Sequence, residues 1–163
     1  MTFCRLISPK WLKQERPDLP NVLEGMFHDD EIKAYNEAGY NAYYLPNHPR
    51  IYPKDTSVSG NHVDVYNCVF VDCDLKDGRY PTKDAFLETI VAANIAPTRI
   101  VDSGNGVHVY WNVSDLDAMS YLRFQRRLMR LFKTDEAVGQ LFQLMRLPGT
   151  MNTKTKDAFT PCI

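Results

Sequence analysis

The sequence has no excess of charge of either sign. Its 19 lysine and arginine residues nearly balance its 20 aspartate and glutamate residues, which gives a formal net charge of -1 at pH 7. Net charge alone would therefore not attract a nucleic acid or an anionic membrane. Any affinity for a polyanion must come from a local cluster of cations.

Long hydrophobic runs are also missing. No stretch of about 18 apolar residues is present, so we expect no membrane-spanning segment and no membrane partner. The N-terminal stretch MTFCRLISPKWLKQERPD lacks the apolar core of a secretory signal. We therefore expect a cytoplasmic protein.

Cysteine is scarce and scattered. None of the four residues forms a CxxC pair, which argues against a zinc site. Cys68 and Cys73 fall in one predicted strand, where a bond between them would be awkward. We expect four free thiols in a reducing compartment, namely Cys4, Cys68, Cys73 and Cys162.

The composition is that of a folded domain. The 163 residues are 44% hydrophobic and 12% aromatic, enough to build a core, and they contain no internal repeat. We therefore interpret residues 1–163 as a single domain. Residue patterns predict helices over 8–14, 28–39, 82–94, 115–133 and 135–147, and strands over 40–47, 63–74, 97–102 and 107–113. This mixed order, with one hairpin, predicts an α+β fold with a mostly antiparallel sheet.

Two aspartates stand at the end of the apolar strand over 63–74. Side chains alternate along a strand, so Asp72 and Asp74 share a face about 7 Å apart. Two neighbouring carboxylates repel each other unless a cation lies between them, and Mg²⁺ or Mn²⁺ prefers such oxygen ligands. A solvated acidic turn is the alternative reading of the motif alone.

The hairpin IVDSGNGVHVYW carries a histidine. His108 and Tyr110 share one face of its second strand, and the apolar Val107, Val109 and Trp111 share the other. The glycines permit positive φ or close approach by a ligand. We expect His108 on an open face, within reach of a phosphate, although this segment taken alone favours a plain surface histidine.

A third segment, RLPGTMNTKTK, surrounds a Pro-Gly turn with cations. Arg146, Lys154 and Lys156 flank this loop, whose backbone N–H groups suit a triphosphate. A helix end followed by a solvated basic loop is the alternative.

The order of these three segments resembles that of the archaeo-eukaryotic primase superfamily. The likeness extends from about Tyr40 to Lys154 and is strongest to the primase–polymerases and RepB-like plasmid primases of phages and mobile elements. It implies an RRM-like sheet with flanking helices and a small N-terminal α/β unit. It also implies a DNA primase and DNA polymerase active in phage or plasmid replication, with a DNA template and primer and with dNTP or NTP as partners.

The resemblance assigns roles to individual residues. The catalytic residues are Asp72, Asp74 and His108, and the two aspartates bind the metal, Mg²⁺ or Mn²⁺. The residues that the resemblance implies for nucleotide binding are Ser103, His108, Arg146, Asn152 and Lys154. The expected chemistry is attack of a 3′-hydroxyl on the α-phosphate of a nucleoside triphosphate.

One position departs from the family pattern. Gln140 stands six residues before Arg146, where relatives carry a third carboxylate. A neutral amide is a poor metal ligand, so we expect Gln140→Asp to raise turnover or lower the metal requirement. The competing hypothesis is that Asp135 or Glu136 supplies the third acid.

Candidate template or nucleotide contacts lie in two further segments. The loop after residue 47 offers Arg50, Tyr52 and Lys54, and the helix over 115–133 gathers cations, including Arg123 and Arg127, on one face. The alternatives are a solvent-exposed helix face and a connecting loop that binds nothing.

Two other functions remain open at this stage. The chain could be a catalytically silent relative that only binds DNA or nucleotide, which Gln140 favours, or a DxD nucleotide-sugar transferase, for which 163 residues is short. Family members usually continue into an accessory helical or helicase domain, so we expect the chain to be a fragment of a longer replication protein.

Overall fold

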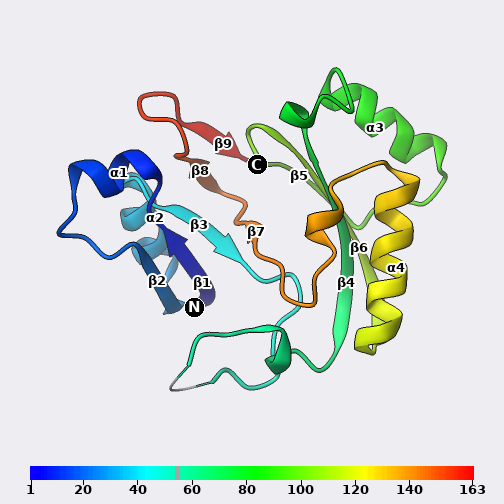
Figure 1. The fold of residues 1–163 in the computed structure, drawn as a ribbon, viewed down its shortest axis with the longest axis horizontal. Helices are drawn as coiled ribbons and strands as arrows, with labels where there is room; N and C mark the ends of the chain where they lie inside the picture. The colour runs from blue at the N-terminus through cyan, green and yellow to red at the C-terminus, as the bar shows by residue number, and fades with distance from the viewer. Residues whose placement is uncertain (54–55) are drawn as a thin grey trace. The chain divides into compact units, whose positions relative to one another are not determined.

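The computed structural model describes residues 1–53 and 56–163. The chain forms two compact units. The first comprises Met1–Leu45 and Leu144–Ile163, and the second comprises Pro46–Gln143. Each unit has its own antiparallel sheet (Figure 1).

The first unit is built on a four-stranded sheet of order β2-β1-β3-β7. All of its pairings are antiparallel. Its core gathers the buried side chains of Cys4, Leu6, Leu12, Ile32, Tyr40 and Ala42. The strands are β1 (Thr2–Ile7), β2 (Val22–Phe27), β3 (Asn41–Tyr44) and β7 (Met145–Arg146), and a separate ribbon pairs β8 (Thr150–Asn152) with β9 (Thr160–Cys162).

Two short helices complete this unit. The first, α1 (Lys10–Glu15), forms where a helix was predicted, but Ser8 does not cap it, because its hydroxyl donates to the Asn21 carbonyl instead. The second, α2 (Asp29–Glu37), confirms the prediction over 28–39. Gly39 follows it with φ 103°, as a helix C-terminal glycine should.

The second unit has a three-stranded antiparallel sheet of order β4-β6-β5. Its strands are β4 (Tyr66–Asp74), β5 (Arg99–Asp102) and β6 (Gly106–Leu116), and its helices are α3 (Lys83–Ala92) and α4 (Ala118–Leu131). The Thr82 hydroxyl accepts the Ala85 N–H at 3.1 Å and caps the N-terminus of α3, which confirms the helix predicted over 82–94. The predicted hairpin is β5–β6.

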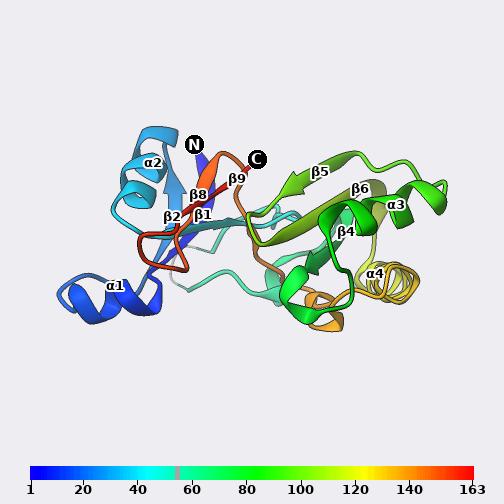
Figure 2. The same ribbon diagram turned by 90° about the horizontal axis from the view of Figure 1, so that it is seen from above.

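The two faces of this sheet differ. Residues opposite one another in antiparallel strands point the same way. Val71, Val109 and Ile100 share one face. Both α3 and α4 cover that face (Figure 2): Ile100 lines a pocket with residues of α3, and Trp111 stacks on Phe132 at the end of α4. The opposite face, which carries Asp72 and His108, is covered by neither helix.

Helix α4 runs beside β4 in the same direction. The Tyr121 ring stacks on Tyr66 at the start of β4, with centroids 4.2 Å apart. One turn further along, the Gln125 side chain binds the Phe70 backbone. The C-terminal end of α4 therefore lies level with the acidic end of β4.

The prediction of a helix over 135–147 is wrong. That segment contains only a 3-10 turn, Glu136–Val138, before Met145 and Arg146 enter β7. Gly139 interrupts the run, and Met145 and Arg146 pair in register with Tyr44 and Tyr43. Pairing within the sheet outweighs a weak helical pattern here.

The fold class is confirmed as α+β, with antiparallel sheets and four helices longer than a single 3-10 turn in the described residues. The four cysteines are free, as expected, and all four are buried. None of the helices in the described ranges has the length and apolar character that crossing a bilayer requires.

Candidate active site

Asp72 and Asp74 lie at the end of β4, on the sheet face that α3 and α4 leave uncovered. Their register partners on β6 are His108 and Gly106. Both aspartates are partly exposed. The Asp74 carboxylate accepts the Lys76 N–H at 3.0 Å, which begins the turn after the strand. The alternation of the strand thus places the two carboxylates on one face.

His108 lies between an acid and a phenol. Its Nε2 is 3.6 Å from the Asp72 carboxylate, and its Nδ1 is 3.2 Å from the Tyr110 hydroxyl. The expectation of an open strand face is wrong, because His108 is only 5% exposed. Its neighbours on this face, Phe70 and Tyr110, are fully buried and pack ring against ring at 5.8 Å. The imidazole is thereby held in place.

The turn of the β5–β6 hairpin is anchored from α3. Lys83 Nζ donates to both Asp102 oxygens, at 2.7 and 2.8 Å, and to the Gly104 carbonyl at 3.1 Å. Asp102 in turn accepts the Gly104 N–H at 2.8 Å, and Gly104 has φ 88°. Ser103, a predicted nucleotide-binding residue, lies buried in this turn.

Asp102 is held ionised by this arrangement. Burial alone would raise the pKa of its carboxyl. Hydrogen bonds from Lys83 and the Gly104 N–H, together with the charges of Lys83 and His108, outweigh burial and keep the pKa below its usual value. Lys83 and Asp102 were not identified from the sequence. The signal available was the Thr82 N-cap, which places Lys83 at the start of a helix.

Gly106 lies where β6 packs closely against the backbone of β4. A Cβ at this position would lie 2.1 Å from the Cys73 carbonyl oxygen and 3.1 Å from the Asp74 Cα. Only glycine therefore allows the strands to meet at the acidic end of β4. Of the two roles predicted for the glycines of this turn, Gly106 allows the close approach and Gly104 adopts the positive φ.

No nucleophilic thiol lies at this site. Cys73 stands between the two aspartates in sequence, but burial first, and then the charges of Asp72 and Asp74, raise the pKa of its thiol to about 11. The thiol stays protonated at neutral pH and is a weak nucleophile. The groups available for chemistry are the carboxylates and the imidazole.

A third carboxylate does not join them. Across residues 1–53 and 56–163, no group of three or more histidine, cysteine, aspartate or glutamate side chains is arranged to hold a metal ion. Asp135 caps the 3-10 turn by accepting the Ala137 N–H, and Glu136 is exposed beside it. Gln140 accepts a hydrogen bond from Tyr121 through its backbone carbonyl. Since Tyr121 stacks on Tyr66, Gln140 lies level with the start of β4 rather than its acidic end.

The residues of the third motif belong to the first unit. Arg146 is buried and donates to Asn41 and to the Tyr43 hydroxyl, with its guanidinium 5.1 Å from the Tyr43 ring centre. The buried Asn152 accepts the Lys154 N–H at 3.1 Å, and the Lys154 side chain is exposed. Arg146 therefore has partners of its own inside this unit.

The candidate template contacts fall in different places. Arg50 is exposed, the Tyr52 hydroxyl bonds His48 at 2.9 Å, and Lys54 lies outside the described residues. Arg123 and Arg127 are exposed on α4. That helix covers the sheet face opposite Asp72 and His108, so these two arginines lie away from the acidic strand end.

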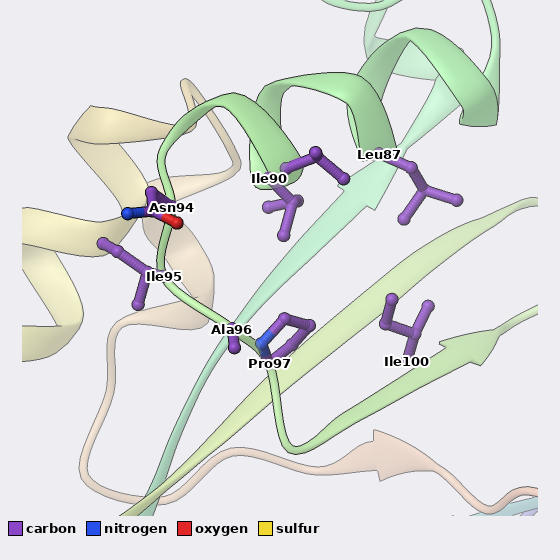
Figure 3. Close-up of a pocket in the computed structure, with 8 residues that line it drawn as sticks. Leu87, Ile90, Asn94, Ile95, Ala96, Pro97 and Ile100 are labelled. Atoms are coloured by element: carbon purple, nitrogen blue, oxygen red, sulfur yellow. The ribbon is translucent and has the colours of Figure 1, made fainter.

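An apolar pocket of about 480 Å³ lies on the helix side of the same sheet (Figure 3). Its walls come from the end of α3, the loop that follows and β5. They offer no cation or carboxylate, so the pocket does not suit a phosphate. The lining residues are Leu87, Ile90, Val91, Asn94, Ile95, Ala96, Pro97 and Ile100.

Three solved structures share the fold. The archaeo-eukaryotic primase domain of the cyanophage S-2L primase–polymerase matches with a TM-score of 0.73 at 18% identity, over 97% of this chain and 78% of that chain. Primase RepB′ gives 0.60 at 18% identity, over 98% of this chain and 48% of that chain. The catalytic domain of RepB′ in complex with initiator DNA gives 0.58 at 18% identity, over 98% and 74%.

The chain therefore has an archaeo-eukaryotic primase-like fold, as the order of its motifs predicts. No family model matches the sequence, and no curated protein sequence matches it. At 18% identity the three structures establish the fold and leave the chemistry to be argued from the site.

Proposed function

We propose that this chain is the core of a template-dependent DNA primase–polymerase that transfers nucleotides from nucleoside triphosphates. One observation carries the proposal: on a primase-like fold, Asp72 and Asp74 share a strand face with His108, which lies 3.6 Å from Asp72. Paired carboxylates beside an imidazole suit phosphoryl chemistry, which depends on charge neutralisation and positioning.

In this proposal Asp72 and Asp74 hold Mg²⁺ or Mn²⁺. When bound, the cation would neutralise phosphate charge and lower the pKa of the attacking hydroxyl. Two carboxylates fit one divalent cation whose other ligands come from water and the triphosphate. Lys83 and Asp102 fix the turn that carries Ser103, and Asp72 and Tyr110 orient the His108 ring for contact with the phosphates. Within the first unit, we propose Asn152 and Lys154 of the basic loop, next to Arg146, as nucleotide-binding residues.

The direct test is primer extension on a DNA template with Asp72→Asn and Asp74→Asn. Each variant keeps the side-chain shape but loses a charge, so we expect incorporation to fall by at least about 100-fold, as for loss of a group that stabilises transition-state charge. Asp77→Asn is the matched control, since Asp77 is exposed a few residues further on. Extension by Asp72→Asn at the rate of the Asp77→Asn control would refute the proposal.

Nucleotide binding supplies a second test. His108→Gln and Lys154→Ala should each weaken triphosphate affinity by roughly ten-fold or more, the value of a charge-assisted contact. Lys76→Ala, which removes an exposed lysine of the second unit, is the control. A melting curve verifies that the buried His108 site stays folded. Unchanged affinity in both variants would place these side chains away from the nucleotide.

A silent relative that only binds DNA or nucleotide is the second candidate. It is favoured by one observation, the lack of a third metal-binding acid in the described parts of the chain. The two functions separate in the same assays. A silent relative would bind a triphosphate or DNA and show no extension with any metal, in the wild type as in Asp72→Asn.

A further inference from the structure

The outer face of α4 concentrates positive charge. Arg123, Arg126, Arg127 and Arg130 are all exposed on it, and the helix sequence AMSYLRFQRRLMRL contains no aspartate or glutamate. Within the described residues, no salt bridge joins any of the four to an acidic side chain. A helix face that merely meets solvent usually mixes both signs of charge. A chain with net charge -1 has therefore gathered four arginines on one helix, of which Arg123 has the N-cap residue Asp117 as an electrostatic neighbour.

Apolar side chains stand beside these arginines. Phe124 is 50% exposed and Leu131 is 55% exposed, whereas Tyr121 and Met129 of the same helix are buried. Phe124 precedes Arg127 by three residues and Leu131 follows it by four, so the three side chains line one flank of the helix. An exposed aromatic ring among arginines offers both a stacking surface and phosphate contacts, the combination that single strands require.

This face points away from the sheet face that carries Asp72 and His108, while the C-terminal end of α4 lies level with the acidic end of β4. Helix α4 packs on the sheet face of Val71 and Val109, and its arginines point away from that sheet. The sheet and the thickness of a helix, about 10 Å, separate them from Asp72 and His108. A strand bound along Arg123 and Arg127 would therefore run on the opposite side of the sheet from the proposed reacting groups.

We propose that the outer face of α4 is a second binding surface for single-stranded nucleic acid, separate from the carboxylate site. The arginines contact backbone phosphates, and Phe124 stacks on a base. The surface would hold a stretch of template away from its reacting part. This role in holding a template rests on the proposed function. The binding of a single strand does not rest on it, because binding is measured without nucleoside triphosphate or metal.

The experiment is fluorescence anisotropy of a labelled oligothymidylate of about 20 nucleotides, longer than one small binding site, titrated in EDTA at several salt concentrations. The full chain is compared with the triple variant Arg126→Gln/Arg127→Gln/Arg130→Gln. Removing three phosphate contacts should reduce the slope of log affinity against log salt by about 2. Between about 50 and about 200 mM salt, the wild type should then lose roughly 20-fold more affinity than the variant.

Two controls separate this surface from a general charge effect. Lys10→Gln/Lys13→Gln/Lys33→Gln makes the same change in net charge on exposed residues of α1 and α2 and should keep the wild-type slope. Phe124→Ala should weaken binding about five-fold or more with no change in slope, since it removes a stacking surface but no charge. Leu131→Ala removes exposed apolar surface without a ring and should have little effect.

Three results would overturn the proposal. The first is an unchanged salt slope in the triple arginine variant while its melting temperature equals that of the wild type. The second is an equal loss of slope in the lysine control. The third is binding of the wild type to phosphatidylglycerol vesicles with no affinity for the oligonucleotide, which would make α4 a membrane-surface helix. If the wild type shows no extension activity but binds the oligonucleotide with the expected salt slopes, the proposed catalytic function is wrong and the proposed binding surface on α4 is supported.

Discussion

The side chain of Gln125 forms a two-way hydrogen-bonded pair with the backbone of Phe70. Its Oε1 accepts the Phe70 N–H at 3.1 Å, and its Nε2 donates to the Phe70 carbonyl. Phe70 lies in β4, an outer strand of the sheet order β4-β6-β5. An amide from α4 thus takes the place that a neighbouring strand would otherwise fill. Asn47 does the same for Cys68, accepting its N–H and donating to its carbonyl.

Replacing Gln125 with leucine should destabilise the protein strongly. Gln125 is 0% exposed. Leucine cannot form hydrogen bonds, so it would leave the buried N–H and C=O of Phe70 unpaired. Each unpaired group costs about 1–3 kcal/mol, so the free energy of unfolding should fall by roughly 2–4 kcal/mol. Urea titration measures it, with the exposed Gln14→Leu as control. A loss no greater than in the control would mean that the amide pairing does not support β4.

Gly106→Ala should loosen the acidic end of β4. The new methyl group would meet the Cys73 carbonyl at 2.1 Å, so β6 must shift away from the strand that carries Asp72 and Asp74. We expect a loss of about 2–3 kcal/mol in unfolding free energy, typical of an overpacked site. Gly25→Ala in β2 is the matched control, because its nearest neighbour lies 3.9 Å from the added atom. Equal melting temperatures for the two variants would show that the strands separate at no cost.

The Lys83–Asp102 pair should give stability that disappears in acid. The folded-state pKa of Asp102 is depressed, so its contribution is fully present above the unfolded value near 3.9 and is lost as pH falls through the lower folded value. Since the two side chains are 28% and 38% exposed, Lys83→Met should cost no more than about 1 kcal/mol at neutral pH. Melting temperatures of both proteins should converge below about pH 4. Lys76→Met is the control, and a constant difference at every pH would mean that the lysine acts by packing alone.

The metal requirement should be insensitive to Gln140. Tyr66, whose ring marks the level of Gln140, lies six residues before Asp72 on β4, about 20 Å away. Contrary to the expectation from sequence, Gln140→Asp should therefore change the metal concentration for half-maximal extension by less than about two-fold. With only two carboxylates, Mn²⁺ should support extension better than Mg²⁺, since it binds such ligands more tightly. A several-fold gain in Gln140→Asp would show that this segment reaches the site in the active complex.

Much of the second unit could be predicted from local pattern. The alternation in VFVDCD places Asp72 and Asp74 together, and the SGNG turn between two apolar runs defines the hairpin that brings His108 opposite Asp72. These features depend on the two-residue period of a strand and on turn chemistry, both of which short stretches encode. The helices α3 and α4 were predictable from the helical spacing of their apolar residues, which is also a local pattern.

Other features depend on partners distant in sequence. Strand β2 contains Gly25 and is mostly half-exposed, so its own pattern is weak, and it forms because β1 pairs with it. The burial of His108 and the anchoring of Asp102 by Lys83 likewise arise from tertiary packing. Strand propensity reflects such surroundings more than the residues themselves. The sequence alone predicted that Asp72 and Asp74 share a strand face, but it did not indicate the side chains that pack around Asp102 and His108.

The two-segment construction of the first unit has a consequence for biosynthesis. Residues 46–143 form one uninterrupted unit, which can fold as soon as they leave the ribosome. The first unit must wait for residues 144–163, because contacts such as that of Arg146 with Asn41 join positions 105 apart. Closing so long a loop is entropically costly and slows folding. During translation, β1, β2 and β3 therefore remain without their C-terminal partner, and this interval is when a chaperone would be needed most.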